Sequence, residues 1–214
     1  MITLNVDLKQ KTEDFYNKFF SKEAKEGKKE ILGYCLNKAW ADATQRERFK
    51  GAQQSEIIKH KDKIIKTLRT EIENRKFSAD YDTWHNKVCS RKTHTMKYGI
   101  WQKFINMTFK YMYCFEQQHK DEVSVFSDID FSKCHCPIDS VIAQRAVTLC
   151  LVCNKKPSDE IVSIARSGDI NWNNMKQSDY ENVRKNIQKI KNEFTINNPD
   201  TVHPTELEFD FLFW

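Results

Sequence analysis

The sequence predicts an all-α protein, and three observations support this fold class. Glycine and proline, the residues that most often interrupt helices, number only 5 and 4 among 214 residues. Several long segments repeat apolar side chains at the three- and four-residue spacing of a helix. With 39% hydrophobic and 30% charged residues, the composition is that of a folded globular chain. We therefore expect one helical domain over residues 1–214, with a substantial core.

The N-terminal half contains three segments with helical periodicity. Residues 6–20, 30–49 and 53–76 each place apolar side chains on one face. The first two segments are expected to contribute to the core. The third is strongly charged, which indicates an amphipathic helix with a solvated face. That face carries the basic residues Lys66, Arg69, Arg75 and Lys76.

A central helix is expected over residues 100–115. Apolar side chains occur nearly all round this segment, and a helix that is apolar on every side is a buried one. Gly99 lies directly before it and is the natural point for a hairpin, because glycine tolerates conformations that other residues avoid. The polar and acidic residues 116–133 that follow are expected to form an inserted loop.

A second apolar helix is expected to begin at about Ser140. Pro137 cannot occupy a helix interior, and Asp139 is a favourable N-cap residue. Residues 175–192 then predict a charged amphipathic helix, and residues 197–204 interrupt it. The chain ends on an aromatic-rich segment, TELEFDFLFW.

Charge and cysteine content restrict the function classes. A net charge of +5 is compatible with a polyanionic partner such as double-stranded DNA. The chain has no apolar signal segment at its start and no run of 18 apolar residues, so we expect no membrane association. Its 7 cysteines are an odd number, and we expect them to be reduced in a cytoplasmic protein that acts as a monomer without a cofactor.

Two ionisable residues, Lys103 and Asp139, stand at the expected starts of the two apolar helices. A lysine in the first turn of a helix faces the positive end of the helix dipole, and burial removes its water. Both effects disfavour the ammonium form and favour an amine nucleophile. A carboxylate at an N-cap is stabilised instead, and it can support positive charge that develops on a sugar ring. The simpler alternative is a snorkelling surface lysine and an ordinary helix cap.

In this region the sequence resembles the helix-hairpin-helix DNA glycosylases, and most closely the archaeal 8-oxoguanine DNA glycosylase type. In that superfamily a glycine-containing hairpin precedes the catalytic lysine, and a Pro-hydrophobic-Asp segment brings the catalytic aspartate. Here GIWQK ends in Lys103 and CPID ends in Asp139, 36 positions later. The archaeal type also carries an insertion between the two residues. The resemblance implies a helix-hairpin-helix glycosylase-like bundle of two lobes, about 1–95 and 96–214, with the active site between them.

The C-terminus extends this resemblance. The archaeal type ends with an Asp and a Trp, four residues apart, that hold the extruded base. LEFDFLFW supplies Asp210 and Trp214 at that spacing. By resemblance, Asp210 would hydrogen-bond the base edge and Trp214 would stack on its face, which are the contacts that a flipped base needs.

The chain departs from the family pattern at two positions. Trp101 replaces the usual second hairpin glycine, and Met107 stands where the archaeal type has an aromatic residue against the base. The resemblance covers roughly residues 96–153 and the last ten. It implies DNA-backbone contacts around the hairpin, and the residues expected to make them are Arg91, Lys92, Lys97, Gly99 and Trp101.

The function implied is a DNA glycosylase, with or without lyase activity, that excises a modified base through Lys103. The base could be an oxidised purine, as in DNA repair, or a modified base of phage DNA, as in antiviral defence. One alternative is a helical nuclease or toxin of a phage-defence system that uses His85, Arg91, His94 and His135. Another is a non-catalytic nucleic-acid-binding module.

A metal site is a further alternative. Cys134, Cys136, Cys150 and Cys153 form CxC followed by CxxC, and four thiolates could bind zinc. The second pair lies within an apolar helical run, however, where cysteine is often a small buried hydrophobe. We therefore expect no metal.

Overall fold

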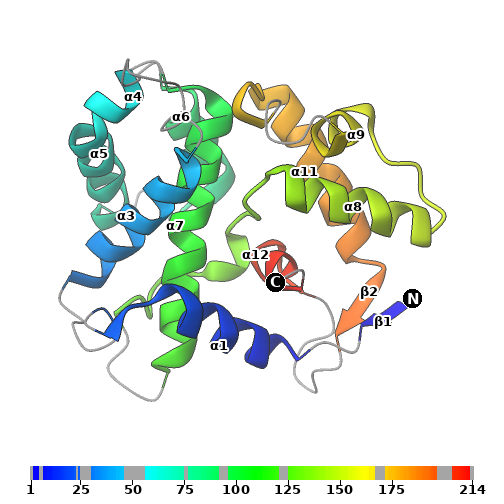
Figure 1. Ribbon diagram of the computed structural model, residues 1–214, viewed down its shortest axis with the longest axis horizontal. Coiled ribbons are helices and arrows are strands. Elements are labelled where there is room, and N and C mark those ends of the chain that lie inside the picture. The colour runs from blue at the N-terminus through cyan, green and yellow to red at the C-terminus, as the bar shows by residue number, and fades with distance from the viewer. Residues whose placement is uncertain are drawn as a thin grey trace.

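The computed structural model describes residues 2–4, 7–22, 24, 30–45, 56–74, 77–91, 96–120, 125–166, 172–196 and 204–212. Within these ranges the protein is all-α apart from one small sheet (Figure 1). The helices are α1 (Leu8–Phe19), α3 (Ile31–Ala43), α4 (Glu56–Lys59), α5 (Lys61–Glu73), α6 (Tyr81–Cys89), α7 (Tyr98–Gln118), η3 (Phe131–Lys133), α8 (Ser140–Val152), α9 (Asp159–Arg166), α11 (Gln177–Lys191) and α12 (Glu206–Phe211).

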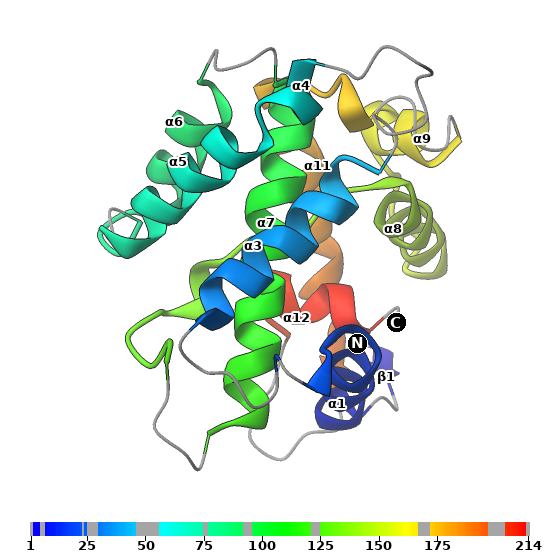
Figure 2. The ribbon, with the colours of Figure 1, turned by 60° about the vertical axis from the view of Figure 1, so that its left-hand side comes forward.

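Helix α7 runs through the centre of the molecule. Helices α3, α5 and α6 lie on one side of it, and α8, α9 and α11 lie on the other (Figure 1). A turned view shows α3 crossing the front of α7, with α1 and α12 near its lower half (Figure 2). One hydrophobic core continues from α1 to α12, and 16 of the 21 residues of α7 are buried. This confirms the expected buried central helix.

The N-terminal elements agree with the sequence expectation except at one point. Helices α1 and α3 occupy the expected segments, but residues 53–76 do not form one helix. Helix α4 ends at Lys59 and α5 begins at Lys61, because the backbone at His60 leaves the helical conformation. No proline or glycine marks this break, so the periodicity of the apolar residues could not reveal it.

The start of α7 differs from the expectation in two ways. The helix begins at Tyr98, so Gly99 lies inside its first turn rather than at a hairpin before it. Lys103 therefore falls in the second turn, where the helix dipole acts less strongly than in the first. Gly99 has a different role. A Cβ atom there would lie 1.9 Å from the carbonyl oxygen of Trp172, so the glycine permits a close approach of two backbones.

The starts of α8 and α12 are fixed by side-chain caps. Asp139 accepts hydrogen bonds from the backbone N–H groups of Val141 and Ile142, which confirms a helix that begins at Ser140. Thr205 and Glu208 form a capping box at the start of α12. Both caps satisfy N–H groups that would otherwise lack partners. They also place Asp139 and Asp210 at defined positions, one before α8 and the other within α12.

A short parallel sheet joins the N-terminal segment to the segment that follows α11. Strand β1 (Ile2–Leu4) pairs with β2 (Phe194–Ile196), with Ile2 opposite Phe194. The sequence analysis did not predict these strands, because three residues are too few for an alternating pattern to emerge. In the described part of the chain, no helix has the length and apolar character needed to cross a membrane.

A buried polar network connects α6, α7, the segment before α8, and α11. The His135 imidazole contacts the Tyr180 hydroxyl at 2.9 Å and the Asp82 carboxylate at 2.8 Å. The His85 Nε2 atom contacts the Asn106 side chain at 3.0 Å. Burial lowers the pKa of both His85 and His135, so these rings are held in the neutral form.

We predict that acidification destabilises the fold through these two histidines. In the unfolded chain a histidine has a pKa of about 6.5, whereas burial lowers it in the folded protein. The unfolded state therefore binds more protons below about pH 6.5, and the free energy of unfolding should fall as the pH decreases. Urea denaturation at pH 7.5 and pH 5.5 measures this. His135→Gln should reduce the pH dependence, and an unchanged pH dependence in this variant would contradict the prediction.

We predict that Gly99→Ala destabilises the protein by about 1–3 kcal/mol. The new methyl group meets backbone atoms of Trp172, which cannot move aside as a flexible side chain can. Gly33→Ala is the matched control, since its Cβ would meet only the ends of two flexible side chains, Glu30 at 3.2 Å and Arg69 at 3.8 Å. In a helix interior, that change should be neutral or stabilising by up to about 1 kcal/mol. Thermal unfolding of both variants tests the prediction, and equal melting temperatures would contradict it.

Candidate active site

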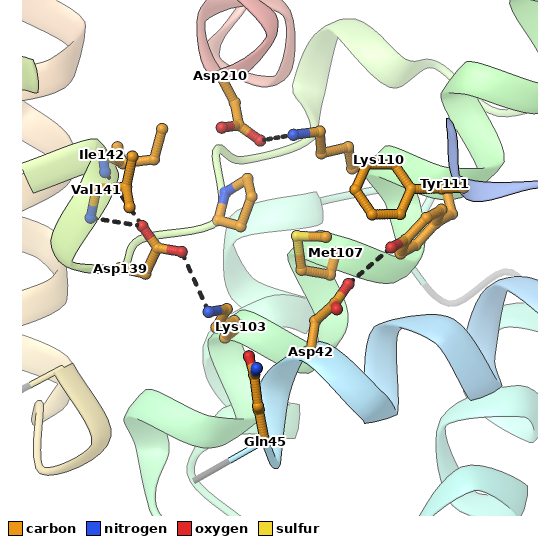
Figure 3. A pocket seen from close by; sticks show the side chains of 12 residues that line it. Asp42, Gln45, Lys103, Met107, Lys110, Tyr111, Asp139, Val141, Ile142 and Asp210 are labelled. Carbon is orange, nitrogen blue, oxygen red and sulfur yellow. Dashed lines mark hydrogen bonds and ion pairs between the residues drawn. The ribbon is translucent and has the colours of Figure 1, made fainter. Parts of the chain in front are cut away.

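A pocket of about 310 Å³ lies beside α7, a size at the lower end of the range of about 300–1,000 Å³ typical of small-molecule sites. Both halves of the chain line it (Figure 3). The lining residues are Phe19, Asp42, Gln45, Lys103, Met107, Lys110, Tyr111, Pro137, Asp139, Val141, Ile142 and Asp210. Four residues singled out from the sequence, Lys103, Met107, Asp139 and Asp210, therefore share one cavity.

Lys103 and Asp139 are in direct contact at the pocket wall. The Lys103 Nζ atom lies 3.1 Å from Asp139 Oδ2, and the two side chains are 13% and 24% exposed. Figure 3 shows them reaching toward one another from α7 and from the start of α8. The contact is an ion pair, so the lysine must give up a proton before its amine can act as a nucleophile.

The two oxygens of Asp139 have different partners. Oδ1 accepts from the N–H groups of Val141 and Ile142 at 3.0 and 3.1 Å, and Oδ2 faces Lys103. The α8 N-terminus stabilises negative charge at this point. The carboxylate is thus held in one orientation, with one oxygen directed into the pocket. A fixed negative charge of this kind can stabilise positive charge that develops on a bound substrate.

Two amide side chains close to Lys103 in α7, Gln102 and Asn106, bind the backbone that leads into Asp139. Gln102 donates to the Ile138 carbonyl at 2.8 Å and accepts from the Ile138 N–H at 3.3 Å. Asn106 donates to the Cys136 carbonyl at 3.1 Å and to the Tyr180 hydroxyl at 2.9 Å. Both side chains are fully buried. Gln102 and Asn106 thus fix the segment that carries Asp139 to α7, the helix that carries Lys103.

Lys103 also contacts Trp172, which is buried beside it. The lysine Nζ atom lies 4.5 Å from the centre of the Trp172 ring, a favourable cation–π distance. The Trp172 backbone is the one that Gly99 accommodates. Gly99 thus acts on the site indirectly, by allowing the aromatic ring to reach the lysine.

Lys110 and Asp210 form a second ion pair, which is deeply buried. Their Nζ and Oδ2 atoms are 2.5 Å apart, and the side chains are 0% and 3% exposed. The rings of Phe15 and Phe211 lie 4.5 and 4.7 Å from the ammonium group. Sequence analysis identified Asp210 but missed Lys110. The signal was available, because Lys110 follows Lys103 by seven residues, or about two helical turns, and so lies on the same face of α7.

Asp42 is a third carboxylate in the pocket, and it was also missed. It comes from α3, and its Oδ2 atom accepts from the Tyr111 hydroxyl at 2.7 Å. Burial raises the pKa of Asp42 from its usual value, although the Tyr111 hydrogen bond and the nearby lysines act in the opposite direction. Sequence analysis did not identify Asp42, because only the crossing of α3 over α7 brings it to the pocket.

The residues expected to contact the DNA backbone differ in their exposure. Trp101 is 0% exposed and packs in the core, so the expectation that it contacts DNA is wrong. Gly99 is buried against Trp172 and is likewise not available to a phosphate. Lys97 is exposed next to the start of α7 and contacts Asn174, while Arg91 is paired with Glu71 at 2.6 Å. Lys92 and Trp214 lie outside the described residues.

The histidine residues of the alternative nuclease site and the cysteines of the alternative metal site are not arranged as a site among the described residues. His85 and His135 are buried inside the polar network, where a nucleic-acid phosphate cannot reach them, and His94 lies outside the described residues. The described side chains contain no group of three or more His, Cys, Asp or Glu residues arranged to hold a metal. Burial also raises the pKa of Cys134, Cys136 and Cys150, which disfavours the thiolate that zinc requires.

We predict that Gln102→Leu lowers the free energy of unfolding by about 1–3 kcal/mol, because the buried N–H and C=O groups of Ile138 lose their partner. Gln144→Leu is the matched control. Gln144 makes one exposed hydrogen bond to the Ala165 carbonyl, so its loss should change stability by no more than about 0.5 kcal/mol. Chemical denaturation of both variants measures the difference, and equal effects would contradict a clamping role for Gln102.

Comparison of the chain with protein-family models, with curated proteins and with solved structures finds no match.

Proposed function

We propose that this protein is a DNA glycosylase that removes a modified base from double-stranded DNA with Lys103 as its nucleophile. The observation that carries the proposal is the 3.1 Å contact between Lys103 and Asp139 on the wall of a pocket that also contains Asp210. The likeness of GIWQK, CPID and LEFDFLFW to helix-hairpin-helix glycosylase motifs supports the same reaction.

The proposed reaction begins with extrusion of the target nucleotide into the pocket. Lys103, once deprotonated, attacks the anomeric carbon of the deoxyribose. The bond from its Nζ atom to that carbon forms as the glycosidic bond breaks, and the bonding electron pair leaves with the base, which takes up a proton. Asp139 stabilises the positive charge that develops on the sugar ring, as carboxylates do in glycoside cleavage.

A lyase step can follow from the same intermediate. Loss of a proton from the attached nitrogen and opening of the sugar ring convert the adduct into a Schiff base, which is the usual product of a lysine and a carbonyl carbon. The imine makes the neighbouring sugar hydrogen acidic, and its removal allows the 3′ phosphate to leave. Borohydride reduces the imine and so traps the protein on DNA covalently.

The pocket contains groups suited to a base as well as to the sugar. The Lys110–Asp210 pair offers both a hydrogen-bond donor and an acceptor, and Met107 offers an apolar contact between the two polar walls (Figure 3). Lys97, at the exposed start of α7, is the candidate for a phosphate contact. We propose a cytoplasmic role either in repair or in defence against phage DNA that carries modified bases.

We predict that Lys103→Gln abolishes covalent trapping and lowers base release by about 10³-fold or more, because the nucleophile is lost. The measurement is borohydride trapping and base release on duplexes that contain oxidised, alkylated or deaminated bases. Lys133→Gln, which changes an exposed lysine that does not line the pocket, is the control. Wild-type protein that neither traps nor releases any base would refute the proposal. Unchanged DNA binding by Lys103→Ala without any activity in the wild type would indicate a binding module.

We predict that Asp139→Asn lowers base release by about 10²–10³-fold while α8 remains intact. Asparagine caps helices nearly as well as aspartate, so it can keep the hydrogen bonds to Val141 and Ile142. It removes only the negative charge that faces Lys103. Single-turnover rates, combined with melting temperatures, separate the two effects. A loss of activity that merely follows a loss of folding would contradict the assigned role.

A further inference from the structure

Trp172 is a buried aromatic residue beside the proposed nucleophile, and none of the motifs identified in the sequence includes it. The Lys103 Nζ atom lies over the face of its ring, 4.5 Å from the ring centre. The tryptophan is 2% exposed, and the lysine side chain is 13% exposed. The ammonium group therefore has an aromatic face on one side and the Asp139 carboxylate on another, at 3.1 Å.

Contacts with the start of α7 fix the position of this ring. Gly99 lies so close to the Trp172 carbonyl that a Cβ atom would be 1.9 Å from the carbonyl oxygen. The same carbonyl accepts from the Met175 N–H at 3.2 Å, and the Lys97 ammonium contacts Asn174 at 2.5 Å. This short segment is therefore held against the first turn of α7, and the ring has a defined place beside the nucleophile.

An aromatic face and a carboxylate attract a cation in different ways. A carboxylate accepts a hydrogen bond from the nitrogen and can also take its proton. An aromatic face attracts the charge through the ring quadrupole and needs no N–H group, so aromatic residues also bind methylated lysine and quaternary ammonium ligands. The indole is only a hydrogen-bond donor, so it does not take the proton. Trp172 can therefore stay a partner of the Lys103 nitrogen after carbon has replaced one of its hydrogens.

The proposed reaction returns positive charge to this nitrogen twice. When neutral Nζ bonds to the anomeric carbon and the base leaves with the glycosidic electron pair, the nitrogen becomes a secondary ammonium. It then loses a proton, and its electron pair forms the C=N bond as the bond from the anomeric carbon to the ring oxygen breaks. The released oxygen takes up a proton. The resulting iminium carries its charge at Nζ, the atom over which the Trp172 ring lies.

We propose that the Trp172 ring stabilises the positive charge of the Lys103 nitrogen in the covalent adduct with DNA. The inference rests on the proposed glycosylase function and adds a residue to its site. An interaction speeds a reaction only where it is stronger in the transition state than before it. In the free protein, Asp139 shares the charge of an ammonium group that has three N–H donors. In the iminium one N–H remains and bound DNA excludes water, so the ring contributes more there.

Fluorinated tryptophan at position 172 tests the proposal, because fluorine withdraws electron density from the ring face with little change in size. The full-length protein is prepared with mono-, di- or tetrafluorotryptophan at this position. Borohydride trapping is measured on DNA with an abasic site, where the same iminium forms with loss of water, and trapping by Lys103→Gln gives the background. We expect the trapping rate to fall stepwise with the number of fluorines, by about tenfold for the tetrafluorinated ring.

Trp101 is the matched control. It is 0% exposed in α7, and its ring packs against Phe104. The same fluorinated residues at position 101 should leave the trapping rate as it is, and melting temperatures should be similar in both series. Equal rates for every ring at position 172 would overturn the inference, and so would an equal decrease in the two series. In either case, wild-type trapping would leave the proposed glycosylase function in place. Absence of wild-type trapping and base release on every duplex would refute both.

Discussion

Helix α7 is enclosed by other elements along almost its whole length, and this burial places a strict demand on every polar side chain that it carries. A buried polar group without a partner costs roughly 1–3 kcal/mol, and a buried charge costs more. Three polar side chains of α7 meet that demand through neighbouring segments of the chain. Gln102 and Asn106 bind the backbone before α8, and Lys110 pairs with Asp210 of α12. The site is thus assembled by the same contacts that satisfy the core.

Lys103 differs from these buried polar residues because its side chain is partly exposed. Its side chain is 13% exposed, with Asp139 on one side and the Trp172 ring on another. Its neighbours in sequence, Gln102 and its partner Asn106, fix the segment that delivers Asp139. A displacement of that segment would move the carboxylate and the α8 N-terminus together. Position and electrostatics at this site therefore depend on the same few hydrogen bonds.

The pocket combines two ion pairs with a third carboxylate, Asp42, whose described hydrogen-bond partner is the Tyr111 hydroxyl. The two pairs differ in exposure. Lys103 and Asp139 are 13% and 24% exposed, whereas Lys110 and Asp210 are almost fully buried. The rings of Phe15 and Phe211 lie beside the Lys110 ammonium, and a surrounding of low polarity strengthens its attraction to Asp210. In the reaction that we propose, the more exposed pair would meet the sugar and the buried pair the base.

The sequence by itself determined the helical class, the buried central helix, and the cap at Asp139, because periodicity and capping are local properties. The order of the motifs also identified Lys103, Asp139 and Asp210 as candidates for one site. Tertiary structure alone decided that Trp101 is buried, that Gly99 makes room for Trp172, and that Asp42 faces the cavity. The physical reason is that these features depend on which helix packs against α7 at each level. The crossing of α3 over α7 brings Asp42 to the pocket from more than fifty residues away in the chain, a distance that no local pattern records.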